Sequence, residues 1–236
     1  MYKIALNAGH YMNTPGKRCL KSIDPKETRE WYLNDRICDK VENKLKAYTG
    51  YSLLRIDDTT GKTNVTLNNR AAKANNFKAD VYISVHHNAG INGGSGGGVM
   101  AYTYLKVSDK TKQIQKLLYN KIIEKTGLKG NRATPITSAN LAECRLTSMP
   151  AVLLECGFMD STVDTPIILT DAFAEKTAAA ICEALVQLGG LKLKETKAPA
   201  DNGKLYYVQV GAYKEKANAE KMVQNLKKAG FDAVIK

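Results

Sequence analysis

Short apolar runs alternate with longer segments of helical periodicity through the first 190 residues. Segments of the strand type cover residues 3–10, 51–56, 79–88, 98–105 and 150–158. Segments with apolar residues at three- and four-residue steps cover 24–48, 66–77, 109–128 and 171–189. This alternation predicts an α/β fold with a mixed, largely parallel central sheet flanked by helices.

The first helical segment carries a capping signal at its start. Asp24 is a plausible N-cap, Pro25 would take the first helical position, and Glu27 follows three residues after the cap. We therefore expect this helix to begin at Asp24 and to run to Tyr48. Glu30 then lies one turn later than Glu27 and faces the same side.

A carboxylate interrupts the last strand, where residues 152–157 read VLLECG. Successive side chains of a strand point to opposite faces, so Val152, Leu154 and Cys156 share one face and Glu155 lies on the other. Burying an unpaired carboxylate is costly. We expect Cys156 to fill the core and Glu155 to reach the rim of the sheet.

Two further segments bear on the organisation of the chain. Residues 90–99, GINGGSGGGV, lack the lysine of a phosphate-binding loop and are typical of a flexible rim loop. Residues 191–204 are charged and contain Pro, Ala and Gly, as linkers do. Residues 205–236 predict a small strand–helix–strand unit.

The formal net charge of +12 favours a polyanionic partner such as an acidic wall polymer. The chain has no long basic run and no aromatic–basic signature, so we expect no nucleic acid partner. No apolar run is long enough for a membrane span, and the N-terminus lacks the apolar stretch of a signal peptide. Five cysteines without a two-residue spacing indicate reduced thiols and synthesis in the cytoplasm.

All three histidines, His10, His86 and His87, stand at the carboxyl end of a predicted strand. Sites of open α/β sheets form at that edge. His86 and His87 should point to opposite faces, so one of them can join a site. Two histidines and a carboxylate form a typical catalytic zinc site, and Glu27, Glu30 and Glu155 are the candidate carboxylates.

Five motifs, in order, resemble the zinc-dependent N-acetylmuramoyl-L-alanine amidases of the amidase-3 type, which include autolysins and phage endolysins. They are IALNAGH, EWYLN, VTLNNRAAKAN, ADVYISVHHNA and RLTSMPAVLLECGFMDS, and they span residues 1–190. The resemblance implies a peptidoglycan hydrolase that cuts the amide bond between N-acetylmuramic acid and L-alanine of the stem peptide.

Carried over position by position, the resemblance implies one zinc ion held by His10, Glu30 and His86. Glu155 matches the catalytic glutamate, which takes a proton from the attacking water and passes it to the leaving amine. Asn88 and Arg145 stand in the matched motifs and are candidate substrate-binding residues.

The chain departs from the family at two places. The family usually has Asp where Asn7 stands, and a Gly-rich segment where this chain has YMNTPGKRC at 11–19. Cys19 lies in that segment and is a further residue that could reach a metal.

Residues 205–236 resemble about the first half of the sporulation-related repeat (SPOR), a peptidoglycan-binding module. Together these resemblances divide the chain into a catalytic domain at 1–190, a linker at 191–204 and a partial SPOR-like wall-binding unit at 205–236. We expect an enzyme without a signal peptide that reaches the bacterial wall after phage or mother-cell lysis.

Two alternatives stay open: a non-catalytic peptidoglycan-binding protein on the same scaffold, and a zinc peptidase that cuts within the stem peptide. The first would be expected to lack one or more of His10, Glu30, His86 and Glu155, and all four are present. The oligomeric state is not encoded in any pattern that we recognise.

Overall fold

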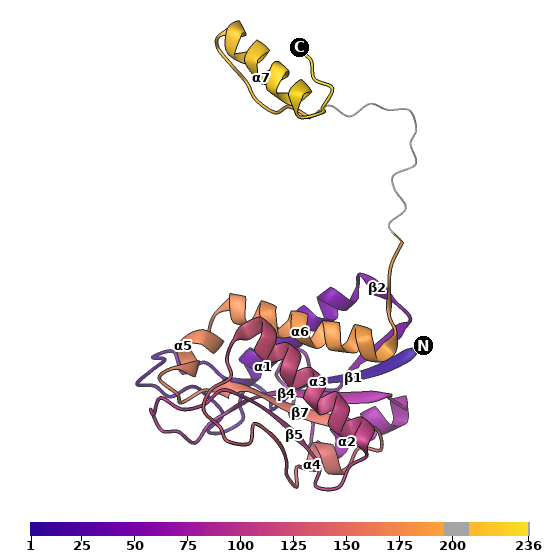
Figure 1. Cartoon of the computed structure of the whole chain (residues 1–236). Helices are drawn as coiled ribbons and strands as arrows, with labels where there is room; N and C mark the ends of the chain where they lie inside the picture. Colours follow the sequence, from indigo (N-terminus) through magenta and orange to yellow (C-terminus); the bar gives the residue numbers. More distant parts are fainter. Residues whose placement is uncertain (196–207, 236) are drawn as a thin grey trace. The chain divides into compact units, whose positions relative to one another are not determined.

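A computed structural model of the chain describes residues 1–195 and 208–235 (Figure 1). The chain divides into two compact units, Met1–Lys194 and Glu195–Lys236. Part of the expected linker, 196–204, lies outside the described residues, as do 205–207 and 236 of the expected C-terminal unit.

The first unit is built on a six-stranded sheet in the order β3-β1-β4-β7-β5-β6. Its strands are β1 (Tyr2–Ala8), β3 (Tyr51–Arg55), β4 (Val81–Asn88), β5 (Val99–Thr103), β6 (Ile136–Ser138) and β7 (Ala151–Phe158). Every neighbouring pair is parallel except β5 and β7. The expected mixed, largely parallel sheet is confirmed.

Helices cover both faces of this sheet (Figure 1). The larger core lies under α1 (Glu30–Leu45), α3 (Asp109–Thr126) and α6 (Asp171–Gly189). The smaller core, on the opposite face, lies under α2 (Leu67–Phe77) and α4 (Ala142–Arg145). A short helix, α5 (Asp164–Ile168), follows β7. Strand β7 divides its side chains as expected, since Val152, Leu154 and Cys156 belong to the larger core and Leu153 to the smaller.

The expected start of the first helix is wrong. The helix α1 begins at Glu30, five residues after the expected first helical position at Pro25, and ends at Leu45. Asp24 does use its carboxylate to accept backbone N–H groups, from Lys26 at 3.2 Å and Thr28 at 2.7 Å, but it does so in a turn. Glu27 has a left-handed backbone (φ 48°), which an α-helix excludes.

A two-stranded sheet joins β2 (Tyr48–Thr49) to β8 (Lys192–Leu193). Residues at the start of the expected linker thus belong to the first unit, and the backbone N–H of Lys194 donates to the Ala47 carbonyl at 2.8 Å.

The second unit contains one described helix, α7 (Lys216–Lys228), which confirms the helix of the C-terminal unit. Within residues 208–235, the segments on either side of α7 form no strand pairs. Neither described part of the chain has a helix that is both long and apolar enough to cross a membrane.

Candidate active site

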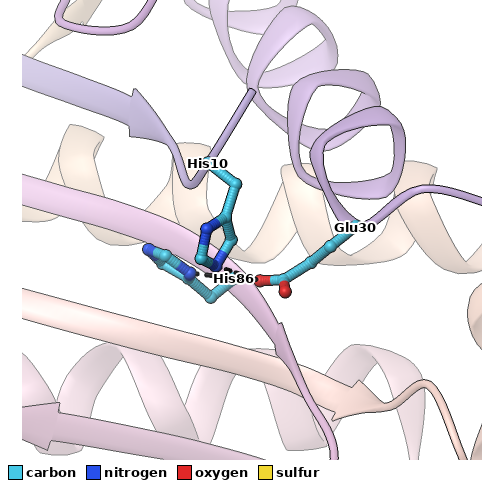
Figure 2. A group of neighbouring side chains, drawn as sticks. All are labelled: His10, Glu30 and His86. Atoms are coloured by element: carbon cyan, nitrogen blue, oxygen red, sulfur yellow. Dashed lines mark hydrogen bonds and ion pairs between the residues drawn. The ribbon is translucent and has the colours of Figure 1, made fainter. Parts of the chain in front are cut away.

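Three side chains from distant parts of the chain meet at the carboxyl edge of the sheet. His10 follows β1, Glu30 is the first residue of α1, and His86 lies near the end of β4. Figure 2 shows the three side chains pointing toward one another. One ligand atom from each lies within 4.8 Å of the other two.

The Glu30 carboxylate is the centre of this group. Its Oε1 lies 3.3 Å from His10 Nε2 and 3.1 Å from His86 Nδ1. The same oxygen accepts the backbone N–H of His87 at 3.2 Å. Although burial alone would raise the pKa of Glu30, hydrogen bonds from His10 and His86 hold it well below its usual range.

These residues fit a zinc ion. Zinc bound at about 2.0–2.2 Å in tetrahedral geometry keeps its ligand atoms roughly 3.3 Å apart, close to the two separations found here. Two imidazole nitrogens and a carboxylate oxygen are the donor set of a catalytic zinc site with an open position. In addition, Glu30 Oε2 is buried without a hydrogen-bond partner, and Lys17 Nζ lies 3.6 Å away.

Position 9 has no room for a side chain, because the His86 ring lies against Gly9. A Cβ at this position would lie 2.1 Å from His86 Cε1. His10, the next residue, has a left-handed backbone (φ 66°). The residues that follow β1 therefore leave room for the His86 ring and set the direction of the His10 side chain.

His86 and His87 point to opposite faces, as expected. His86 contacts Glu30 through Nδ1 and Glu143 through Nε2, the latter at 3.3 Å. His87 faces α1, where its Nδ1 lies 2.7 Å from Asn34 Oδ1. Burial lowers the pKa of His87 to about 3. Burial opposes the charged form of His86 too, but hydrogen bonds to Glu143 and Glu30 raise its pKa to about 10.

Glu155 lies directly beside His86 in the sheet. The two residues are register partners in the parallel pair β4–β7, so their side chains share a face. Glu155 Oε2 is buried without a hydrogen-bond partner. Burial is the main cause that raises the pKa of Glu155 to about 7, and the charges of Glu30 and Glu143 add to it.

A β-bulge follows Glu155. His86 pairs with Glu155 but Asn88 pairs with Phe158, so β7 has one extra residue in this interval. Gly157 lies there with φ +102°, a conformation that favours glycine. The glycine of the VLLECG run thus ends the regular ladder immediately after the carboxylate.

Sequence reasoning missed Glu143, a buried residue of the short helix α4. Its Oε2 accepts from Ser84 Oγ at 2.7 Å and its Oε1 from Asn7 Nδ2 at 3.1 Å. Burial opposes its ionisation, but hydrogen bonding to His86 outweighs that cost, and its pKa is lowered to about 2. A four-residue helix has too little periodicity to mark such a residue.

The remaining candidates occupy different surroundings. Asn88 is half-buried and accepts the Ala89 N–H, while Arg145 is exposed and donates to Asn140 Oδ1 at 2.6 Å. Glu27 pairs with Arg18, 3.1 Å from its Nε. Cys19 does not join the ligand group, and burial raises the pKa of its thiol to about 12.

The Gly-rich segment 90–99, expected to be flexible, is held by carboxylates. Asp160 Oδ2 accepts the backbone N–H groups of Gly90, Ile91 and Asn92 at 2.7–2.8 Å. Asp164 Oδ2 accepts the N–H of Gly98 at 2.6 Å. This rim therefore has a defined shape.

Comparison with known proteins identifies the family of the chain. Residues 4–187 match the N-acetylmuramoyl-L-alanine amidase family model and residues 202–236 match the SPOR domain. A sporulation-specific N-acetylmuramoyl-L-alanine amidase of Bacillus subtilis (strain 168) is 33% identical over 238 residues, which cover 100% of this chain and 84% of that protein. An endolysin of Bacillus phage SPP1 is 36% identical over 125 residues, 53% of this chain and 46% of the endolysin.

Among solved structures, the N-acetylmuramoyl-L-alanine amidase from Clostridium difficile 630 superposes with a TM-score of 0.70 at 27% identity. The match covers 79% of this chain and 95% of that one. The family match spans most of the described first unit, including His10, Glu30, His86 and Glu155. On these grounds the chain belongs to the N-acetylmuramoyl-L-alanine amidase family and carries a SPOR-domain sequence at its C-terminal end.

Proposed function

We propose that this protein is a zinc-dependent amidase of bacterial peptidoglycan that cuts between N-acetylmuramic acid and L-alanine. In this proposal His10, Glu30 and His86 hold one zinc ion, and Glu155 is the general base. The observation that carries it is the convergence of three ligand atoms within 4.8 Å, with Glu155 adjacent to His86 in the sheet.

Zinc, when bound, would polarise the amide carbonyl and make water more acidic. The chain supplies the proton transfers. Glu155 takes a proton from the water whose oxygen bonds to the amide carbon, and it gives that proton to the nitrogen as the C–N bond breaks. The products are a lactyl carboxylic acid and a free L-alanine amine.

The surroundings of Glu155 support this role. A general base works best when its pKa lies near the operating pH. Burial raises the pKa of Glu155 to about 7, and its Oε2 has no protein partner to occupy it. The neighbouring thiol of Cys156 points into the larger core instead.

Each part of the chain has a role in this proposal. Residues 1–190 would be the catalytic domain, 191–204 a linker, and 205–236 a wall-binding unit, with Asn88 and Arg145 contacting substrate. The names of the relatives, one sporulation-specific and one an endolysin, support action on the wall of a lysing cell.

Digestion of purified peptidoglycan tests the reaction. We expect new L-alanine amino termini and no new reducing sugar ends. A peptidase would release amino termini other than L-alanine. A protein that only binds peptidoglycan would release no new amino termini and no new reducing ends. The E155Q protein should bind about one zinc per chain and retain its thermal stability but lose activity by roughly 10²-fold or more. An active E155Q protein would refute the general base.

A further inference from the structure

Glu143 contacts His86 on the side that faces away from the metal ligands. His86 Nδ1 lies 3.1 Å from Glu30 Oε1, and its Nε2 lies 3.3 Å from Glu143 Oε2. A neutral imidazole carries one proton on its two nitrogens. If Nδ1 binds a metal, the proton must be on Nε2, where Glu143 can accept it.

The two oxygens of Glu143 have different partners. Oε2 accepts from Ser84 Oγ at 2.7 Å and faces His86. Oε1 accepts from Asn7 Nδ2 at 3.1 Å and lies 4.0 Å from Arg70 Nε. The orientation of the carboxylate is therefore set from β1, β4 and α2, independently of the histidine.

Arg70 connects this carboxylate to the other histidine. Its guanidinium is buried, bonds to Asn7 Oδ1, and donates to the carbonyl of Ala8 at 2.7 Å and that of His10. Across residues 1–195 and 208–235, Glu143 is the one carboxylate within 4.0 Å of this cation. The nearby positive charge of Arg70 offsets part of the cost of burying the Glu143 carboxylate.

We infer that Glu143 is the positioning residue of the metal site: it accepts the His86 Nε2 proton and so fixes the ring with Nδ1 toward the metal. This inference rests on the proposed zinc-dependent function. Carboxylates that orient a ligating histidine in this way typically affect metal affinity by about 10- to 100-fold. Glu143 need not touch substrate.

The test compares zinc binding by full-length E143Q, by the unchanged protein and by E183Q. Glu183 lies on α6, where it pairs with Lys121 and Lys125, so E183Q makes the same chemical change away from the site. Zinc affinity is measured by competition with a chromogenic chelator. We expect about 10- to 100-fold weaker binding for E143Q and unchanged binding for E183Q.

A second readout separates positioning from general stability. In the zinc-loaded protein, nitrogen–proton NMR correlations of His86 should show the proton on Nε2 with slow exchange, and E143Q should lose that slow exchange. If E143Q does not fold, Ser84→Ala removes one bond that orients Glu143 and should weaken zinc binding a few-fold.

Each result has a distinct meaning. Wild-type zinc affinity in E143Q, or in Ser84→Ala where that variant replaces it, overturns the role of Glu143 and leaves the zinc amidase standing. An unchanged protein that binds no zinc overturns the proposed metal site, and the role of Glu143 with it.

Discussion

Gly9 shows how one residue without a side chain shapes the candidate site. The Cβ of Ala at position 9 would overlap the His86 ring, which is buried. We predict that Gly9→Ala displaces this ring, weakens zinc binding at least tenfold, and destabilises the fold by about 1–3 kcal/mol. Zinc competition and urea unfolding measure the two effects.

Gly127→Ala is the matched control. Gly127 caps α3 with φ +70°, and a Cβ there would meet no atom within 4 Å. This variant should lose about 1 kcal/mol through backbone strain yet bind zinc normally. Equal zinc affinities in the two variants would contradict the role given to Gly9.

The buried His87 side chain should make the stability of the fold sensitive to acid. Burial lowers its pKa to about 3 in the folded chain, against about 6.5 in an unfolded one. As the pH falls below 6.5, the unfolded chain takes up a proton there and the folded chain does not, so stability falls. The slope from this group approaches about 1.4 kcal/mol per pH unit until the folded pKa is reached.

His87→Gln should therefore flatten the stability profile between pH 6 and pH 4. Urea unfolding of both proteins with chelator present measures this slope without a contribution from metal binding. The free energy of unfolding at any one pH can differ between the two proteins. The test compares only how steeply that free energy changes with pH. Parallel profiles would show that His87 does not titrate as stated.

The sequence predicts which side chains meet at the candidate site better than it predicts the local structure around them. Strand ends and motif order indicate His10, Glu30 and His86, and these three side chains do converge. The start of α1 was misplaced because Asp24 accepts backbone N–H groups equally well in a turn and at an N-cap. Glu143 acquires its partners Asn7 and Ser84 only when α4 packs beside α2 and β7, which no local pattern encodes.

At the scale of elements, the Asp160 carboxylate holds the start of the loop between β4 and β5. Asp160 accepts three consecutive N–H groups and is buried. We predict that Asp160→Ala destabilises the protein by roughly 2–4 kcal/mol and speeds amide exchange at 90–92. Zinc affinity should stay unchanged, because Asp160 does not belong to the ligand group.

Asp160→Asn serves as the graded control, since it keeps an acceptor oxygen but no charge. Its effects on stability and exchange should fall between those of the unchanged protein and Asp160→Ala. Protected amides at 90–92 in Asp160→Ala would mean that other contacts, such as the Asp164 bond to Gly98, suffice to hold the loop.

At the scale of the whole molecule, the two compact units differ in how they are stabilised. Both hydrophobic cores lie within the first unit, whereas none of the residues of α7 is buried. Val208, Phe231 and Val234 are exposed in the described part of the second unit. The first unit therefore has the apolar burial that a domain needs to fold alone.

We predict that a protein ending at Glu195 keeps its unfolding temperature and its activity on soluble muropeptides but binds insoluble peptidoglycan less well. Pelleting with purified walls measures binding, and the inactive E155Q variant of each length keeps the walls intact during the assay. Equal pelleting of both lengths would show that the net positive charge which residues 1–195 retain, rather than the SPOR sequence, holds the enzyme on the wall. A lower unfolding temperature would show instead that the first unit requires the second for its stability.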